Sequence, residues 1–277
     1  MGMQINTNIA ANNSYRNLSI TQNDLSKSLE KLSSGLRINR AADDAAGLAI
    51  SEGLRSQVGG LTVAARNAQD GISVIQTAEG GLTEVHAILQ RVRDLAVQAG
   101  NDSNNAKSRT AIQTEVTALT DELTRVSASA NFNGIKLLDG SGTAMTFQVG
   151  AGGVAAEDQI VVNLATANVA TVATAVGALT FDTAANAAAA VTALDTQITN
   201  ISEARAGLGA VQNRFESTIK SLNVSKENLS AAESRIRDTD MASEMVKYTR
   251  SNVLSQAGTA MLAQANQSNQ GVLQLLR

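Results

Sequence analysis

The stretch from Leu61 to Ala99 reads LTVAARNAQDGISVIQTAEGGLTEVHAILQRVRDLAVQA and determines the architecture of the chain. Its apolar residues recur at alternating spacings of three and four, the pattern of a helix that packs along one seam. The register slips once, between Ile75 and Leu82. The seam residues are Leu61, Ala65, Ala68, Ile72, Ile75, Ala78, Leu82, Val85, Leu89, Val92 and Ala96. At about 1.5 Å per residue, such a helix is a rod roughly 50 Å long.

Helical spacing continues on both sides of this stretch. Toward the N-terminus, a leucine seam predicts a helix over Thr7–Ser34 that stops at Gly35. That seam consists of Leu18, Leu25, Leu29, Leu32 and Leu36. On the other side, the polar turn GNDSNN, Gly100–Asn105, leads to a third seam formed by Ile112, Val116, Leu119, Leu123, Val126 and Ala130. Because the turn is short, we expect the second and third helices to be antiparallel neighbours.

Two glycine pairs interrupt the long seam, Gly59-Gly60 and Gly80-Gly81. Glycine lowers helix stability, so each pair indicates either a bend or a weak point in the helix. The sequence does not distinguish these two readings.

The pattern changes at Asn131, where NFNGIKLLDGS carries the turn dipeptides Asn133-Gly134 and Asp139-Gly140. Met145, Phe147 and Val149 alternate as in a half-buried strand, and Ile160–Leu164 is a second candidate strand. The Ala/Thr-rich stretch Ala165–Ala190 has low complexity and predicts an exposed surface segment with weak strands at most. Acidic residues outnumber the single base, Lys136, between Asn131 and Ser202. We therefore expect residues 131–190 to form a β-rich, exposed segment.

Helical spacing returns as Leu194, Ile198, Ile201, Leu208, Phe215, Ile219, Leu222, Leu229 and Ile236, and a last helix carries Met241, Met245, Tyr248, Leu262, Leu273 and Leu276. The last helix has few charges and a narrow apolar stripe, so it needs a partner. The N-terminal helix is similar, and we expect the two ends to pair with each other and with further copies. The sequence thus predicts a mainly α-helical protein. Its N- and C-terminal segments form a long antiparallel helical rod or coiled coil, with a small β-hairpin region in the middle.

The composition of the 277-residue chain excludes several classes of protein. It contains no Pro, no Cys and no Trp, and aromatic residues make up 2%, which favours long helices and thin apolar seams over a thick globular core. Without cysteine there are no disulfides or thiolate ligands. A net charge of −3 argues against nucleic-acid binding. The apolar run Ala184–Leu194 is too short to span a bilayer, so no membrane insertion is expected. The N-terminus has no apolar region typical of a cleaved signal peptide.

The sequence gives no support for catalysis. His86 is the single histidine, and the chain has no sequence motif for a metal, nucleotide or nucleophile site. Two adjacent carboxylates, Asp43 and Asp44, follow the expected end of the first helix at Gly35. Their place at the head of the next helix favours a cap at a corner, with Arg37 and Arg40 as ion partners, over an acid/base pair. We expect no enzyme activity, no cofactor and no metal.

Six blocks of the sequence resemble bacterial flagellins and occur in the order of that family. They are MQINTNIAANNSYRNL (Met3–Leu18), KLSSGLRINRAADDAAGLAIS (Lys31–Ser51), LQRVRDLAVQAGN (Leu89–Asn101), NFNGIKLLDG (Asn131–Gly140), RAGLGAVQNRFESTI (Arg205–Ile219) and VLQLLR (Val272–Arg277). Only about Gly140–Ala190 remains for the variable region, so the chain resembles a short member of the family.

The resemblance implies a structural subunit of the extracellular flagellar filament. It implies that residues 1–43 and 239–277 form the inner filament core, and that 44–238 form the surrounding rod. The leucines, methionines and tyrosine of the two terminal seams are then the filament-core residues. It further implies secretion through the flagellar channel, an export chaperone at the C-terminal helix, and contacts with filament cap and hook-junction proteins.

The same resemblance implies recognition by host innate immunity. By position, Arg91, Leu95 and Glu115 match receptor-contact residues for a Toll-like receptor, and Gln98 lies on the same expected helix face as Arg91 and Leu95. The alternative is that these residues contact neighbouring subunits in the filament. The terminal leucines Leu273, Leu275 and Leu276 resemble the end sensed by cytosolic immune receptors.

Three other functions fit parts of the sequence. A hook–filament junction protein shares the terminal helices, although the blocks at Arg205–Ile219 and Val272–Arg277 favour the filament subunit. A flagellin with an inserted protease has too little variable region here. A coiled-coil adhesin predicts fixed small oligomers in place of an open polymer.

Overall fold

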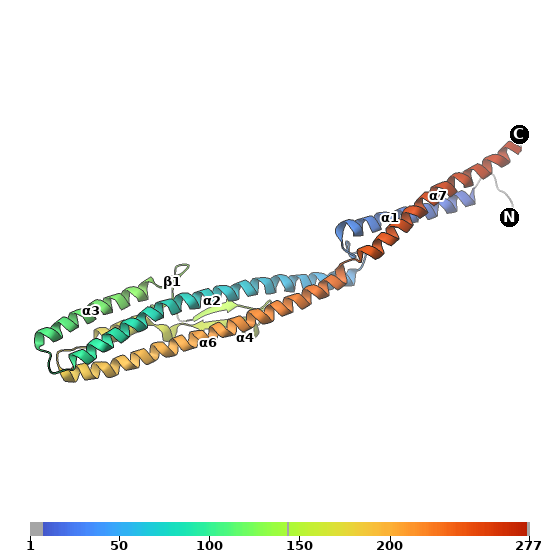
Figure 1. Cartoon of the computed structure of the whole chain (residues 1–277). Coiled ribbons are helices and arrows are strands. Elements are labelled where there is room, and N and C mark those ends of the chain that lie inside the picture. Colours follow the sequence, from blue (N-terminus) through green and yellow to red (C-terminus); the bar gives the residue numbers. More distant parts are fainter. Residues whose placement is uncertain (1–7, 143, 276–277) are drawn as a thin grey trace. The chain divides into compact units, whose positions relative to one another are not determined.

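The computed structural model describes the backbone of residues 8–142 and 144–275 (Figure 1). Its long helices are α1 (Ile9–Ser34), α2 (Ala45–Ala99), α3 (Ala106–Ser129), α6 (Ala184–Arg237) and α7 (Met241–Leu275). The remaining elements are β1 (Asn131–Phe132), β2 (Ile135–Lys136), β3 (Ala144–Gln148), α4 (Ala155–Asp158), β4 (Gln159–Asn163), the 3₁₀ turn η1 (Ala165–Ala167) and α5 (Val169–Gly177). The expected fold class, long helices around a small antiparallel strand region, is confirmed.

The chain divides into two compact units. The terminal unit comprises the described parts of residues 1–56 and 228–277, and the middle unit is residues 57–227. Both dividing points lie inside long helices, α2 and α6. The division at 43 and 239 expected for the filament core instead coincides with the turns that precede α2 and α7, and as a functional boundary it stays a prediction.

The middle unit is built along the seam of α2. Helices α2, α3 and α6 run side by side (Figure 1), and the α2 residues from Ile75 to Ala96 that form the seam are buried at 2% exposure or less. The polar turn reverses the chain as expected, since α2 ends at Ala99 and the Asn105 side chain caps α3 by accepting from the Ser108 N–H at 2.9 Å. The apolar seams of the three helices therefore face a common core.

Helix α2 passes through its glycines without interruption, so neither glycine pair ends the helix. Several of these glycines are points of close approach. A Cβ on Gly71 would lie 2.7 Å from the Phe215 ring of α6, and one on Gly81 would lie 2.7 Å from Leu138 Cδ1. Gly59 and Gly80 have open space beside them. The missing side chains at Gly71 and Gly81 thus let bulky residues pack against the backbone of α2.

The expected hairpins are present in the middle unit. Strands β1 and β2 pair through a tight turn at Asn133 and Gly134, whose φ angles of 49° and 80° are the left-handed values that this dipeptide favours. Strands β3 and β4 pair antiparallel, with Met145 opposite Val162 and Phe147 opposite Ile160. The ring of Phe147 meets that of Phe215 edge to face, with centroids 5.7 Å apart. The β-region is thereby fastened to α6.

The expectation for Ala165–Ala190 is wrong. This stretch forms η1, α5 and the first turns of α6, and it contributes the buried residues Ala167, Val169, Val172, Ala173, Val176, Phe181, Ala187 and Ala190. Helix α5 packs on α3. Small side chains allow such close packing, and for the same reason they leave a weak hydrophobic pattern in the sequence. Residues 131–190 are therefore neither uniformly β-rich nor uniformly exposed.

In the terminal unit, α1 and α7 lie antiparallel along each other (Figure 1). Their least exposed residues alternate at spacings of three and four on both helices. On α1 these are Ala11, Ser14, Leu18, Thr21, Leu25, Ser28 and Leu32, and on α7 they are Glu244, Tyr248, Ser251, Ser255, Gly258, Leu262 and Ala265. The expected pairing of the two ends is present, but its seam passes through Ser28 and leaves Leu29 outside at 56% exposure.

Candidate assembly interface

The interface between α1 and α7 is thin. On α1 only Leu18 and Ser28 are buried, and on the part of α7 whose side chains are described only Glu244 is buried, at 4% exposure. The Ser28 hydroxyl donates to Glu244 Oε1 at 2.7 Å, and Lys247 Nζ lies 3.0 Å from Glu244 Oε2. At the far end of α1, Asn8 Nδ2 donates to the Ala265 carbonyl at 2.9 Å. The two helices cover little of each other's apolar surface, and most of their large apolar side chains stay exposed.

Exposed apolar side chains follow both helices of this pair. On α1 and α7 they are Ile9, Tyr15, Ile20, Leu29, Met241, Met245, Val246, Val253, Leu254 and Met261, each at least 47% exposed. An apolar groove on α7 is lined by Met245, Val246, Thr249, Arg250, Val253 and Leu254. The α7 side chains in this groove form one contiguous apolar patch, and such patches are typical of surfaces that bind another protein.

The structure divides the residues expected in the terminal seam into two groups. Leu18, Leu25, Leu32, Leu36, Tyr248 and Leu262 are buried or half-buried, whereas Leu29, Met241 and Met245 face outward. The side chains of Leu273 and Leu275 and the whole of Leu276 lie outside the described residues. The seam spacing allows either Ser28 or Leu29 to face α7. Hydrophobicity predicts Leu29, but the structure buries Ser28 and exposes Leu29.

The corner before α2 uses its two aspartates differently. Asp44 Oδ1 accepts from the Gly47 N–H at 2.8 Å, and its carbonyl accepts from the Leu48 N–H, so Asp44 is the N-cap residue of α2. Asp43 Oδ2 accepts from the Arg40 and Asn39 N–H groups, at 3.0 and 3.1 Å, and these bonds lower the pKa of its carboxyl group. Asp43 therefore closes the preceding turn.

The expected ion partners of these aspartates are engaged elsewhere. Arg40 pairs with Glu30 at 2.9 Å, and the Arg37 guanidinium donates to the Ile236 carbonyl at 2.6 Å. Two backbone hydrogen bonds join the segment that follows α1 to the segment between α6 and α7. They run from the Arg37 N–H to the Arg237 carbonyl and from the Thr239 N–H to the Gly35 carbonyl. Backbone N–H groups supply the hydrogen bonds of both aspartates, and neither Arg37 nor Arg40 pairs with them.

The expected receptor patch lies on α2 and α3 in the middle unit. Arg91 of α2 forms an exposed ion pair with Glu115 of α3, at 2.6 Å, and Gln98 is exposed. Leu95 is buried at 2% exposure in the core. The spacing of four residues predicts one shared face for Arg91 and Leu95, but the face of α2 toward α3 and α6 is wide enough to enclose Leu95. The surface thus presents Arg91, Gln98 and Glu115 without Leu95.

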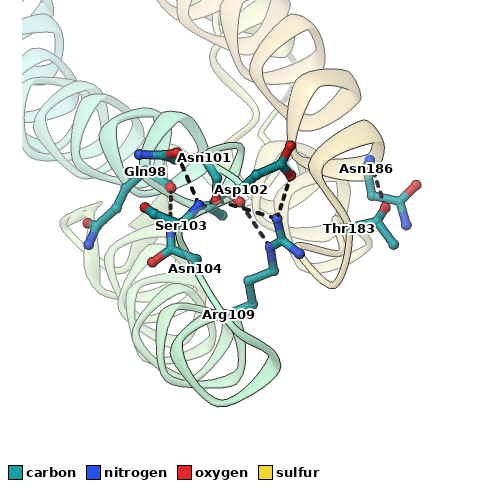
Figure 2. A network of polar contacts seen from close by, with 9 residues as sticks. Gln98, Asn101, Asp102, Ser103, Asn104, Arg109, Thr183 and Asn186 are labelled. Carbon is teal, nitrogen blue, oxygen red and sulfur yellow. Dashed lines mark hydrogen bonds and ion pairs between the residues drawn. The ribbon is translucent and has the colours of Figure 1, made fainter.

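A polar network at the α2–α3 turn escaped the sequence analysis. Figure 2 shows Arg109 reaching back to the turn, where its Nε donates to the Ala99 carbonyl at 3.1 Å and a terminal nitrogen lies 3.6 Å from Asp102. Asn104 Nδ2 donates to the Gln98 carbonyl at 2.6 Å. These bonds satisfy the last carbonyls of α2. The sequence does hold a signal for this network, because Arg109 lies in the first turn of the helix that follows the short polar turn.

The described residues show little that resembles a catalytic centre. They contain no cluster of three or more histidine or acidic side chains able to hold a metal ion, and none of their helices is long and apolar enough to cross a membrane. His86 is half-buried, with Nε2 at 2.9 Å from Gln90 Nε2. Most of the large apolar side chains that are exposed among the described residues lie in the terminal unit.

Comparison with known proteins gives consistent matches over both ends of the chain. Residues 5–143 match the bacterial flagellin N-terminal helical region, and residues 191–276 match the bacterial flagellin C-terminal helical region. A flagellin from Halalkalibacterium halodurans is 52% identical over 275 residues, covering 99% of this chain and all of that protein. A flagellin from Bacillus subtilis is also 52% identical, over 307 residues, with 99% and 100% coverage.

One solved structure illustrates the fold. A putative flagellar hook-associated protein from Vibrio parahaemolyticus superimposes with a TM-score of 0.57 at 14% identity, covering 71% of this chain and all of that one. That likeness concerns the fold alone. The two family regions and the full-length relatives together place the chain in the bacterial flagellin family, whose members are structural subunits of the flagellar filament.

Proposed function

We propose that this chain polymerises head-to-tail through its terminal unit, with α1 and α7 forming the inner core of the filament. The observation that carries the proposal is the exposed apolar patch on α7, together with the exposed apolar side chains of α1 and the thin interface between the two helices. Burial of apolar surface is the main driving force of association. Residues Leu29, Met241 and Met245, which the intramolecular seam leaves exposed, are assigned to contacts with neighbouring copies.

Contacts of this kind do not close on themselves. A heterologous interface that fails to form a ring generates an open helical polymer, which is the architecture a filament requires. A two-helix pair with so little buried surface is marginally stable in water when alone. We therefore propose that the ends of the free monomer, up to about Asn39 and from about Asp240, are frayed and become ordered only at the growing tip.

We propose three further partners, which the resemblance to flagellins implies: an export chaperone, filament cap proteins and hook-junction proteins. The exposed apolar helix α7 is the segment that an export chaperone would cover before secretion, since an uncovered surface of this kind promotes early polymerisation. The absence of proline and cysteine suits a chain that is threaded unfolded and refolds at a distant tip, because prolyl isomerisation and disulfide formation are slow. Filament cap and hook-junction proteins would contact the same terminal helices.

We also propose that the Arg91–Glu115 surface binds a host Toll-like receptor. Its support is the exposure of this ion pair, with side chains 56% and 44% exposed, and the adjacent exposed Gln98. Leu95 takes part only by holding α2 in place. Arg91→Ala is expected to lower receptor activation by soluble monomer about tenfold, the loss of roughly 1.4 kcal/mol. Lys107→Ala on α3 is the control, and equal activation by both variants would contradict this assignment.

The filament proposal is tested by seeded polymerisation. Purified full-length chain is compared with a version lacking residues 1–39 and 240–277, using sedimentation and negative-stain electron microscopy with short filament seeds. We expect long tubes from the full chain and none from the trimmed chain, whose middle unit keeps its helical circular dichroism. Discrete small oligomers from both would contradict the filament role.

A further inference from the structure

The seam between α1 and α7 repeats every seven residues on both helices. Along α1 the apolar members are Ala11, Leu18, Leu25 and Leu32, and the hydroxyl members between them are Ser14, Thr21 and Ser28. On α7 one row is Glu244, Ser251, Gly258 and Ala265, and the other is Tyr248, Ser255 and Leu262. A slip of seven residues therefore places leucine at the same kind of position again. The leucines by themselves do not specify one register.

One contact in this seam has no equivalent seven residues away. Glu244 is the only charged residue among the buried residues of the part of the chain that the structure describes, and its Oε1 accepts the Ser28 hydroxyl proton at 2.7 Å. Thr21, the preceding hydroxyl in the seam, donates its own proton to the Asn17 carbonyl at 2.9 Å. A slip in one direction brings Glu244 opposite Thr21, whose hydroxyl must give up its bond to the Asn17 carbonyl before it can donate to the carboxylate. A slip in the other direction places Ser28 opposite Ser251, and Glu244 then has no seam hydroxyl of α1 opposite it. In both cases the Ser28–Glu244 bond is lost.

The loss of that donor is unfavourable because the carboxylate is almost fully covered. A buried charged acceptor without its partner is strongly destabilising. Lys247 supplies the second hydrogen bond from α7 itself, and it moves with Glu244 in any slip. Lys247 therefore does not discriminate between registers, whereas Ser28 does.

A backbone bridge at the corner, beyond the end of α1, is compatible with the same α1–α7 register. It pairs Leu36 with Asp238, next to the start of α7. Backbone N–H and C=O groups are the same at every residue, so this bridge carries no side-chain selectivity. We propose that the Ser28–Glu244 hydrogen bond selects the register in which α1 pairs with α7. A single polar contact in an apolar seam has this role in coiled coils, where it specifies register at a modest loss of stability.

Cross-linking measures the register directly, because the chain contains no cysteine. A Cβ on Gly258 lies 3.7 Å from Leu18 Cβ, which is within the roughly 3.5–4.5 Å that a disulfide requires. The pair L18C/G258C therefore reports the observed register. The pairs L25C/G258C and A11C/G258C report slips of seven residues in the two directions. The ratio of observed to slipped disulfide yield is measured in the full-length chain under oxidising conditions.

The test compares Ser28→Val with Ser26→Val in each reporter background. Ser26 is exposed on the same helix, so both variants carry the same β-branched substitution. We expect Ser28→Val to lower the ratio about tenfold, the effect of a lost hydrogen bond to a charged group, and Ser26→Val to leave it unchanged. Glu244→Gln, which still accepts from Ser28, is expected to retain most of the preference, and Glu244→Met to lose it.

Three results would overturn the inference. Equal ratios for Ser28→Val and Ser26→Val would show that the leucines and the corner bridge set the register. A loss of all three disulfides in Ser28→Val would show that the contact holds the helices together without selecting their register. A ratio for Glu244→Met equal to that of the unaltered chain would exclude the carboxylate. A disulfide also traps helices that pair only transiently, so the assay does not need polymerisation and remains informative whatever the outcome of the filament test.

Discussion

Asp44 and Asp43 are adjacent residues with separate structural tasks. Their sequence position next to Gly35 predicts a helix cap, and Asp44 has that role through its bond to the Gly47 N–H. The second task, closure of the turn by Asp43, is not visible in the sequence because it depends on the path of residues 39–43. The helix cap can be predicted because it depends only on where the helix starts. The turn closure cannot, because it depends on the direction in which the preceding turn runs.

Removal of the Asp44 cap tests this division. Asp44→Ala leaves the first N–H groups of α2 without an acceptor and is expected to weaken the first turn of that helix by about 1 kcal/mol. Asp44→Asn, which caps equally well, should change it little. The measurement is hydrogen exchange at Ala46–Leu48, where faster exchange is expected for the alanine variant alone. Equal exchange in both variants would mean that the backbone bonds of the corner are sufficient.

Glu244 gives the terminal unit a dependence on pH. Desolvation raises the pKa of this carboxyl group, but hydrogen bonds from Ser28 and Lys247 and the charge of Lys31 together lower it below the ordinary 4.5. Since the folded pKa lies below the unfolded one, the contribution of Glu244 to stability is present above about pH 4.5 and is lost as the pH falls through the folded value. Asp240 caps the same helix end through the Ala242 N–H.

The expected result is that the fraction of chains in which α1 and α7 are paired falls on acidification below that range. Spin labels on the exposed positions Ile20→Cys and Val253→Cys report the separation through their distance distribution. The distribution should broaden as the pH falls below about 4.5 in the otherwise unaltered chain. In Glu244→Gln the broadening attributable to this group should be absent. Identical pH profiles for the two chains would assign the acid sensitivity to other carboxylates.

At the scale of elements, long regular helices were the easiest to predict. The alternating seams of α2 and α3 locate both helices and the turn between them, because a helix that buries one stripe repeats its apolar residues. Helix α5 was missed because alanine, valine and threonine occupy both its buried and its exposed positions. Its buried residues Val169, Val172 and Val176 do follow the helical spacing, but a nine-residue helix gives too few repeats. The role of glycines in α2 depended on partners distant in sequence.

Two glycine-to-alanine substitutions in α2 distinguish the effect of close packing against a neighbour from the effect of helix propensity. Gly71→Ala places a methyl group against the buried Phe215 ring and is expected to destabilise the middle unit by about 1–2 kcal/mol, after the gain in helix propensity. Gly80→Ala meets open space and should stabilise it by about 0.5–1 kcal/mol. Urea unfolding followed by circular dichroism measures both. Stabilisation by both substitutions would show that Phe215 moves aside freely.

At the scale of the whole molecule, the sequence predicts that the two ends pair but not how the chain divides. The pairing is predicted because the first and last helices both carry few charges and one narrow apolar stripe, so each needs a partner. The division into units inside α2 and α6 has no sequence signal, because neither helix is interrupted there. Of the candidate site, the buried and half-buried leucines of the seam were predictable. Ser28 and Glu244 were not, because polar residues are ordinarily assigned to the surface.

The proposed function depends on a difference in stability between the two units. The middle unit has a continuous core of fully buried residues, while the terminal unit has few buried residues and many exposed apolar ones. In the proposed assembly, the ends become ordered on polymerisation, and burial of the exposed apolar side chains against neighbours offsets the loss of chain entropy. This coupling would restrict growth to the filament tip.

Hydrogen exchange of the full-length chain, as monomer and as polymer, tests this coupling most directly. We predict rapid exchange of the amides of α1 and α7 in the monomer, slow exchange of those same amides in the polymer, and slow exchange of the core of α2 and α6 in both. The contrary result is protection of α1 and α7 in the monomer equal to that of the α2 and α6 core. It would mean that the terminal helices are fully ordered before assembly.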